Sequence, residues 1–171
     1  MNIHGHEIII EQPAMVFGDG QHETTRHLLE LLHRYGASGK SYIDIGCGTG
    51  ILSIFASKLG MTVTAIDCDG YAIECTADNI IRNGAENIEV VSGAVERIND
   101  LTADFVTGNF GMEMGIYFAP ILSRFVNKDG ILLMTWYKDL DKIPTDELPK
   151  WEVIDKISGE DYDAYALRRK E

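Results

Sequence analysis

The sequence predicts an α/β protein with a doubly wound, mostly parallel sheet of seven strands that ends in a C-terminal antiparallel hairpin. Three observations predict this class. Helical and strand patterns alternate after residue 40, which is typical of a parallel sheet covered by helices. A glycine-rich turn over residues 46–50 joins an apolar strand to an apolar helix. Two strand patterns flank Gly159-Glu160-Asp161, as in a hairpin. We expect residues 1–171 to form a single domain.

The elements follow from apolar periodicity and from residues that begin or end a helix. The first helix has a leucine-rich face, with Thr24 or Thr25 as its N-cap and Gly36 as its end. Asp129-Gly130 is expected to turn the chain into the fifth strand. The predicted helices cover residues 24–35, 51–59, 71–82 and 113–126. The predicted strands cover residues 41–45, 62–66, 88–91, 104–107, 131–136, 152–158 and 163–169.

The composition places the chain among globular proteins. Hydrophobic residues make up 45% and charged residues 25% of the 171 positions, which argues against disorder. No apolar run approaches the roughly 20 residues that span a bilayer. The N-terminal residues do not resemble a signal peptide. Cys47, Cys68 and Cys75 are odd in number and lack metal-ligand spacing, so we expect reduced thiols, a cytoplasmic protein and no metal site.

The charge of the chain bears on its partners. The 27 acidic and 15 basic residues give a net charge of −12. Such a chain repels phosphate backbones, so duplex nucleic acid is not an expected partner, whereas a basic partner or substrate would be attracted.

The glycine-rich turn is the strongest pointer to a ligand. Gly46, Gly48 and Gly50 allow a ligand to lie against the backbone without meeting a Cβ atom, and the following helix adds free N–H groups and its dipole. A dinucleotide fingerprint requires a third glycine where this chain has Ile51. The chain also lacks the Gly-Lys-Thr/Ser of ATP-binding loops. The turn therefore indicates a nucleotide-like ligand without a pyrophosphate.

An acidic residue at the end of the next strand supports this interpretation. Asp67 stands 17 residues after Gly50, where a carboxylate accepts hydrogen bonds from both ribose hydroxyls of an adenosine. An aspartate at the end of a strand is, by itself, as often without a ligand as with one. Together with the glycine turn, however, Asp67 predicts an adenosine site. Asp69 is expected to cap the following helix.

These motifs resemble those of a known class of enzymes. Asp44-Ile45-Gly46-Cys47-Gly48-Thr49-Gly50 with Ala65-Ile66-Asp67 resembles the first two motifs of the class I S-adenosylmethionine-dependent methyltransferases. Phe17-Gly18-Asp19-Gly20-Gln21-His22-Glu23-Thr24-Thr25-Arg26 is similar to the Phe-Gly-Thr-Gly-x-His-x-Thr-Thr-Arg signature of the ribosomal protein L11 methyltransferase family. The resemblance covers about residues 12–137. It implies a Rossmann-like methyltransferase fold and S-adenosyl-L-methionine as the cofactor.

The resemblance also implies which residues contact the cofactor. In the family, the signature segment closes over the cofactor, so residues 1–23 are expected to form an N-terminal segment and cofactor-covering loop that includes Phe17 and Gly18. Thr24 is expected to help bind the cofactor's carboxylate, although it and Thr25 can instead merely cap a core helix. Cys47 is expected to pack rather than to act as a nucleophile. The remaining expected contacts are Asp44, Gly46, Cys47, Gly48, Gly50, Asp67, Cys68, Gly93, Ala94 and Asn109.

A third motif, Gly108-Asn109-Phe110, is the candidate catalytic site. The family carries Asn-Ile-Leu there, with the asparagine near the transferring methyl group, so Asn109 matches and Phe110 departs. The Asn109 amide can orient a nucleophile, and the Phe110 ring can contact the sulfonium through its π face. The departure at Phe110 leaves the identity of the nucleophile open.

The leading prediction is a methyltransferase that acts on a nitrogen of a protein or small molecule. Family members carry an N-terminal recognition domain, but only about a dozen residues precede the signature here, so a different acceptor or a recognition partner is expected. A non-catalytic S-adenosylmethionine-binding module with a regulatory or assembly role remains an alternative. An NAD-dependent oxidoreductase is a second alternative, weakened by Ile51. The sequence does not predict the oligomeric state.

Overall fold

The computed structural model describes residues 1–109, 121–138 and 151–170. The first two short strands are Asn2–Ile3 (β1) and His6–Glu7 (β2). The helices are Glu23–Tyr35 (α1), Ile51–Lys58 (α2) and Gly70–Arg82 (α3), with short 3-10 helices at Val95–Arg97 and Ser123–Phe125. The other strands are Ser41–Ile45 (β3), Thr62–Asp67 (β4), Ile88–Ser92 (β5), Ala103–Gly108 (β6), Val126–Tyr137 (β7), Trp151–Ser158 (β8) and Tyr162–Arg169 (β9).

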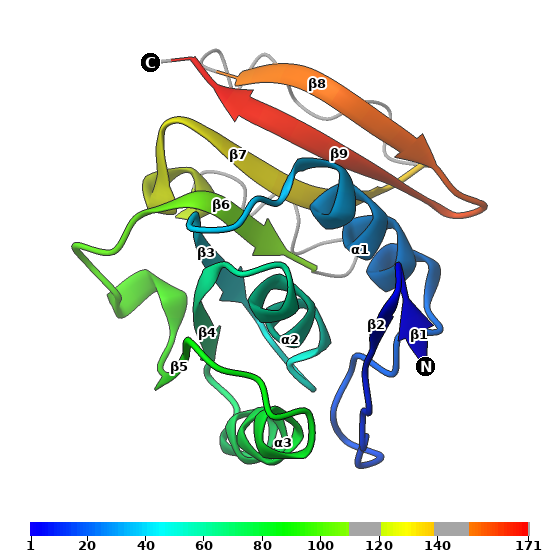
Figure 1. The fold of residues 1–171 in the computed structure, drawn as a ribbon. Helices are drawn as coiled ribbons and strands as arrows, with labels where there is room; N and C mark the ends of the chain where they lie inside the picture. The colour runs from blue at the N-terminus through cyan, green and yellow to red at the C-terminus, as the bar shows by residue number, and fades with distance from the viewer. Residues whose placement is uncertain (110–120, 139–150, 171) are drawn as a thin grey trace.

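The main sheet of the described residues has seven strands in the order β5-β4-β3-β6-β7-β9-β8 (Figure 1). Strands β5, β4, β3, β6 and β7 pair in parallel, β9 is antiparallel to β7, and β8 is antiparallel to β9. The mixed seven-stranded α/β sheet and its C-terminal antiparallel hairpin, both predicted from the sequence, are thereby confirmed.

The structure differs from the predicted elements in four places. His22, rather than Thr24 or Thr25, is the N-cap of α1, because its ring nitrogen accepts the Thr24 N–H. The hairpin of β1 and β2 was not expected from the sequence. Part of the predicted 113–126 helix lies outside the described residues, and its end is a 3-10 turn that leads into β7 at Val126. The predicted turn at Asp129 is an irregularity inside β7, with φ 62° at Asp129.

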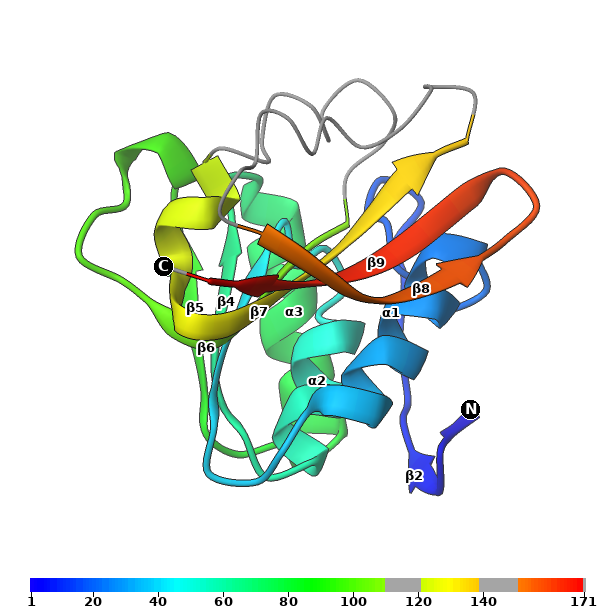
Figure 2. The ribbon, with the colours of Figure 1, turned by 90° about the horizontal axis from the view of Figure 1, so that it is seen from above.

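The three described α-helices cover one face of the sheet. Figure 1 shows α1, α2 and α3 on the same side, and the short strand β2 lies beside them, outside the sheet (Figures 1 and 2). Helix α2 is apolar on nearly all sides because α1, α3 and the N-terminal residues surround it, and Phe55 at its centre is 0% exposed. Burial of such a side chain stabilises the fold by about 2–3 kcal/mol.

The opposite face has its own core. Alternate strand residues such as Ile43, Ile45 and Leu132 face Leu122 and Phe125 there. Because successive strand residues point to opposite faces, the apolar runs of β3, β6 and β7 serve both cores at once. Among the described residues, no helix combines the length and apolar character that crossing a bilayer requires.

The strand order places the ligand-binding edge. From β3 the chain crosses through α2 to β4 on one side, whereas β6 pairs with the other side of β3. The winding therefore reverses between β3 and β6. In sheets of this kind ligands bind at such a reversal, beyond the carboxyl ends of the strands. We refer below to residues 8–21, which run from β2 to α1 past this edge, as the strap.

Candidate cofactor and acceptor site

A cavity of about 410 Å³ lies at this edge of the sheet. Its size falls within the roughly 300–1,000 Å³ range of cavities that hold small organic ligands. The strap, the turn after β3, the end of β4, the start of α3, the end of β6 and the hairpin of β8 and β9 all contribute to it. The residues that line it are Met15, Val16, Phe17, His22, Thr24, Gly46, Gly48, Asp67, Asp69, Ala72, Asn109 and Tyr162.

The glycine turn leaves no room for side chains at two positions, where it meets the strap and where it meets α3. At Gly48, φ is 57° and a Cβ atom would lie 2.4 Å from the Phe17 carbonyl oxygen. At Gly50, φ is 79°, and a Cβ atom would lie 2.9 Å from the Thr76 side chain. Both positions therefore require glycine for backbone conformation and for close approach. On the cavity side, Gly46 and Gly48 present backbone without side chains, so a flat ligand can approach it closely.

Asp67 is fixed by the turn that it follows. Its Oδ2 accepts the Gly48 N–H at 3.1 Å, and its Oδ1 accepts the Asp69 N–H at 3.0 Å. Each carboxylate oxygen retains a second lone pair, so the group can still accept two hydroxyl hydrogen bonds from a ligand. Asp69 caps α3, as predicted, by accepting the Tyr71 N–H at 2.9 Å, and it also lines the cavity.

Asp44 lies beneath the turn, with 1% of its surface exposed. Its Oδ2 accepts the Ser53 hydroxyl hydrogen bond at 2.7 Å, which ties β3 to the first turn of α2. Burial raises the pKa of the Asp44 carboxyl to about 7, with a further contribution from the charge of Asp67, although hydrogen bonds from Ser53 oppose the shift. The Asp44 carboxyl beneath the site therefore changes its protonation state near pH 7.

Asn109 is held from two sides at the end of β6. Its Nδ2 donates to Thr25 Oγ1 at 3.2 Å, and its Oδ1 accepts from Thr135 Oγ1 at 3.3 Å. These contacts hold the amide at both ends, and one Nδ2 hydrogen remains for a ligand. Asn109 is thus a rigid polar group in an otherwise largely apolar part of the cavity. Phe110, the other candidate catalytic residue, lies outside the described residues.

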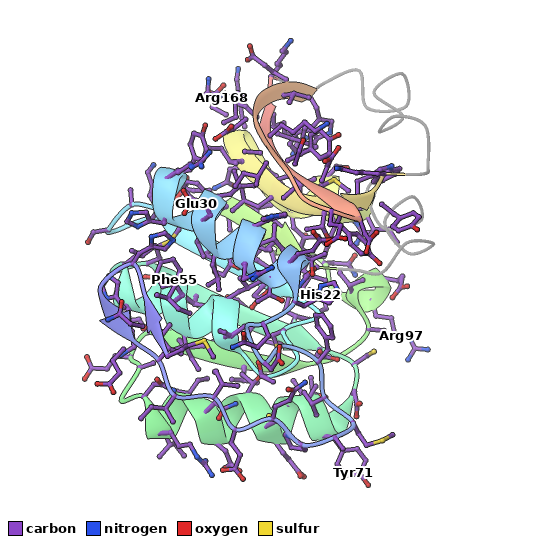
Figure 3. All side chains as sticks on the ribbon, turned by 90° about the vertical axis from the view of Figure 1, so that its right-hand side faces the viewer. His22, Glu30, Phe55, Tyr71, Arg97 and Arg168 are labelled. Carbon is purple, nitrogen blue, oxygen red and sulfur yellow. The ribbon has the colours of Figure 1, made fainter. Side chains whose placement is uncertain are left out.

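Three aromatic rings form one rim of the cavity. His22, at the start of α1 (Figure 3), meets Phe17 at 5.4 Å and Tyr162 at 5.7 Å between ring centroids, both edge to face. His22 Nδ1 accepts the Thr24 N–H and lies 2.7 Å from Thr24 Oγ1, so the hydrogen of the neutral ring belongs on Nε2. Edge-to-face contacts of this kind stabilise the rim by about 0.5–1.5 kcal/mol each.

Glu23 holds the hairpin that supplies Tyr162. Its carboxylate accepts the backbone N–H groups of Glu160, Asp161 and Tyr162 at 2.8, 2.9 and 3.0 Å. Burial raises the pKa of Glu23, but these three hydrogen bonds outweigh it and leave the pKa below its usual value. The first residue of α1 thereby fixes the C-terminal hairpin at the cavity.

The structure brings together part of the predicted site. Phe17, Thr24, Gly46, Gly48, Asp67 and Asn109 line the cavity. The other expected cofactor contacts lie outside the described lining, and their roles remain predictions: Gly18, Asp44, Cys47, Gly50, Cys68, Gly93 and Ala94.

The expected contacts outside the lining support the cavity from behind. Gly18 accepts a hydrogen bond from Thr49 Oγ1, and the Gly93 N–H donates to the Asp67 carbonyl at 2.9 Å. Cys47 packs with its Sγ 3.3 Å from Thr76 Oγ1, and burial raises its thiol pKa far above the usual value. Such a thiol is a packing group, as the sequence indicated.

Sequence reasoning did not assign Met15, Val16, His22, Asp69, Ala72 or Tyr162 to the site. Met15 and Val16 adjoin the signature segment, so their position next to Phe17 was the available signal. Ala72 lies in the first turn of α3, so the predicted cap at Asp69 was the available signal for it. Tyr162 has no local signal, because its place depends on the Glu23 contacts made across more than a hundred residues.

The sheet order and the glycine-and-aspartate site together define the fold of the S-adenosylmethionine-dependent methyltransferases. The model of the ribosomal protein L11 methyltransferase (PrmA) family matches residues 2–164. The chain therefore belongs to the ribosomal protein L11 methyltransferase family.

Individual relatives agree with this assignment. The chain is 40% identical over 129 residues to the ribosomal protein L11 methyltransferase of Acetivibrio thermocellus, a match that covers 74% of this chain and 41% of the relative. It is 38% identical over 131 residues to the enzyme of the same name from Clostridium perfringens, covering 75% and 42%. The matches thus span only about two-fifths of the length of these curated relatives.

Solved structures share the fold. A ribosomal protein L11 methylase from Lactobacillus delbrueckii subsp. bulgaricus superposes with a TM-score of 0.82 at 26% identity, covering 93% of this chain and 83% of that one. The T. thermophilus 16S rRNA methyltransferase RsmC, solved with AdoMet and guanosine, gives a TM-score of 0.84 at 18% identity over 100% of this chain and 49% of that one. The second likeness shows the fold alone.

Proposed function

We propose that this protein binds S-adenosyl-L-methionine and transfers its methyl group to a nitrogen of a basic protein acceptor. The observation that carries the proposal is the conjunction of Asp67 and the side-chain-free glycine turn at the reversal point of the sheet, in a chain of the ribosomal protein L11 methyltransferase family. The name of the family makes a ribosomal protein such as L11 the first acceptor to test.

The described residues fit this cofactor. Asp67 keeps free lone pairs for two ribose hydroxyls, and Gly46 and Gly48 line the cavity without side chains. Asp67 and Asp69 place acidic groups at the cavity, as a cationic ligand requires. Phe17 and His22 offer ring surfaces to a sulfonium.

When bound, the cofactor would supply an activated methyl group on a good leaving group. This chain's own residues then need to orient the acceptor, exclude water and stabilise positive charge. Asn109 is suited to orient the acceptor nitrogen, because both ends of its amide are already fixed by Thr25 and Thr135. The strap and Tyr162 narrow the access of water to the same region.

The acceptor is proposed from charge and from the aromatic rim. With a net charge of −12, the chain attracts basic proteins. The Tyr162 ring lies edge to face with His22 at 5.7 Å and with Tyr137 at 5.2 Å between ring centroids. The three rings provide a wall for the alkyl stem of an amine. We place this activity in the cytoplasm, where the free cysteines of the described chain stay reduced.

Labelled methyl transfer tests the proposal. Purified protein, tritiated S-adenosylmethionine and a bacterial extract or ribosomal protein L11 should give a labelled protein band, and Asn109→Ala should reduce the label by roughly 10–100-fold through loss of orientation. Asn99→Ala, at an exposed asparagine that does not line the cavity, is the matched control.

Titration calorimetry separates the alternatives. Binding of S-adenosylhomocysteine without any labelled product would indicate a non-catalytic binding module. Binding of NAD in place of S-adenosylhomocysteine would favour an oxidoreductase and overturn the proposal.

A further inference from the structure

Two asparagines, Asn79 in α3 and Asn83 at its C-cap, hold the strap by their side-chain amides. Asn83 accepts the Ile9 N–H at 2.9 Å and donates to the Ile9 carbonyl at 2.7 Å. One helical turn earlier, Asn79 accepts the Glu11 N–H at 2.9 Å and donates to the Glu11 carbonyl at 3.0 Å. The spacing of four residues matches the spacing of alternate residues in the extended strap, so each amide acts like a neighbouring strand.

Asn79 makes one contact that Asn83 does not. Its second amide hydrogen donates to the Thr49 carbonyl in the glycine turn at 3.0 Å. Asn79 is 0% exposed, and its oxygen and both amide hydrogens all have partners. A buried amide with every hydrogen bond made is costly to disturb, because removing it strands several polar groups.

Thr49 closes the circuit on the other side. Its N–H donates to the Phe17 carbonyl at 3.0 Å, and its Oγ1 donates to the Gly18 carbonyl at 2.6 Å. The strap is therefore fastened at both ends: residues 9–11 to α3, and residues 17–18 to the glycine turn. Asn79 joins the two fastenings through Thr49.

The part of the strap between the fastenings is short, and it is anchored by one buried side chain. Val16 is 4% exposed and packs against Ala72 and Cys75 of α3. Gln12 Nε2 donates to the Val16 carbonyl at 2.7 Å, which closes this stretch on itself. Of the strap residues that line the cavity, Met15 and Phe17 are 85% and 53% exposed, and the Phe17 ring lies against His22. Figure 3 shows the strap crossing α3 and rising to His22.

We propose that Asn79 is a positioning residue that makes the strap a standing wall of the cofactor cavity, already in place before any ligand binds. Ligand then exchanges past the side chains of Met15 and Phe17, without a swing of the strap backbone. The ligand in this inference is S-adenosylmethionine and thus rests on the proposed function, whereas the standing wall is a property of the ligand-free chain.

Amide hydrogen exchange of the ligand-free protein, followed by NMR, tests the wall directly. In the natural chain, the amides of Ile9, Glu11 and Thr49 should be protected. Asn79→Ala should speed exchange at both Glu11 and Thr49 by at least about tenfold, and the matched control Asn83→Ala should speed it at Ile9 alone. Unprotected strap amides in the natural chain, or an unchanged Thr49 in Asn79→Ala, would overturn the inference.

Calorimetry with S-adenosylhomocysteine measures the consequence. Asn79→Ala should weaken binding at least about tenfold and Asn83→Ala at most about threefold, although each loses the same two strap hydrogen bonds. Equal losses would mean that the asparagines only stabilise the fold. If the natural chain binds no S-adenosylhomocysteine, the proposed function fails, and the exchange pattern still decides on the wall.

A second variant covers the case in which Asn79→Ala does not fold. Thr49→Val keeps the side-chain volume and removes the hydrogen bond to Gly18. It should speed exchange at Thr49 and leave Ile9 and Glu11 protected, because the asparagines still hold them. Loss of Glu11 protection in this variant would show that the asparagine fastening does not stand on its own.

Discussion

Replacement of Asp44 by Asn should make the unliganded protein less sensitive to rising pH. The natural carboxyl has a folded-state pKa of about 7 against an ordinary value of 3.8, because it is buried beneath the glycine turn. The folded state therefore holds its proton more tightly than the unfolded state. The stability that this group contributes is complete below the unfolded value and is lost as the pH rises through the folded value.

The magnitude follows from the shift. Three pKa units correspond to about 4 kcal/mol, of which about 3 kcal/mol is lost between pH 5 and pH 8. Asn has nearly the same size, still offers an oxygen to Ser53, and carries no charge at either pH. The stability of Asp44→Asn relative to the natural chain should thus rise by up to about 3 kcal/mol from pH 5 to pH 8.

Urea unfolding at the two pH values measures this difference. With a slope of about 2 kcal/mol/M, the relative midpoint of the variant should move up by about 1.5 M between pH 5 and pH 8. Asp100→Asn, at an exposed aspartate, is the control and should show no such change. A difference between Asp44→Asn and the natural chain that is the same at both pH values would refute the reasoning, whatever its size.

Two further variants test the site. Asp67→Ala should weaken S-adenosylmethionine binding by about 1–3 kcal/mol in calorimetry, since charged hydrogen bonds to ribose are lost, whereas Asp78→Ala at an exposed position should not; equal affinity would remove Asp67 as the ribose contact. Glu23→Ala should expose the amides of residues 160–162 to exchange at neutral pH. Acidification should expose them in the natural chain, because the lowered pKa of Glu23 gives stability that is present above its ordinary pKa of 4.5 and is lost as the pH falls through the folded-state pKa. Protection that persists in Glu23→Ala would show that other contacts hold the hairpin.

The cofactor side of the site was predictable because its signals are local. The spacing of Gly46, Gly48 and Gly50 between a strand and a helix determines the shape of the turn, and a strand that ends in Asp67 places a carboxylate beside it. These residues lie on adjacent parallel strands joined by one helix, so a pattern within about 25 residues suffices.

The side of the cavity that Tyr162 lines was less predictable because it depends on contacts between distant segments. Tyr162 reaches the cavity only because Glu23 binds the backbone of residues 160–162. Asn79 gave no sequence signal, since a buried asparagine on an amphipathic helix looks like a polar surface residue until the strap is placed against it. The His22 cap competed with two threonines that are equally good caps by residue type.

The contact between Glu23 and the hairpin has a consequence for the order in which the molecule assembles. Its two sides lie 137 to 139 positions apart along the chain, whereas β3 and β4 pair across a single helix. Contacts of short separation form early in folding, and those that close long loops form late. A nascent chain can therefore complete the side of the cavity that holds the glycine turn and Asp67 well before the hairpin that carries Tyr162 closes the other side.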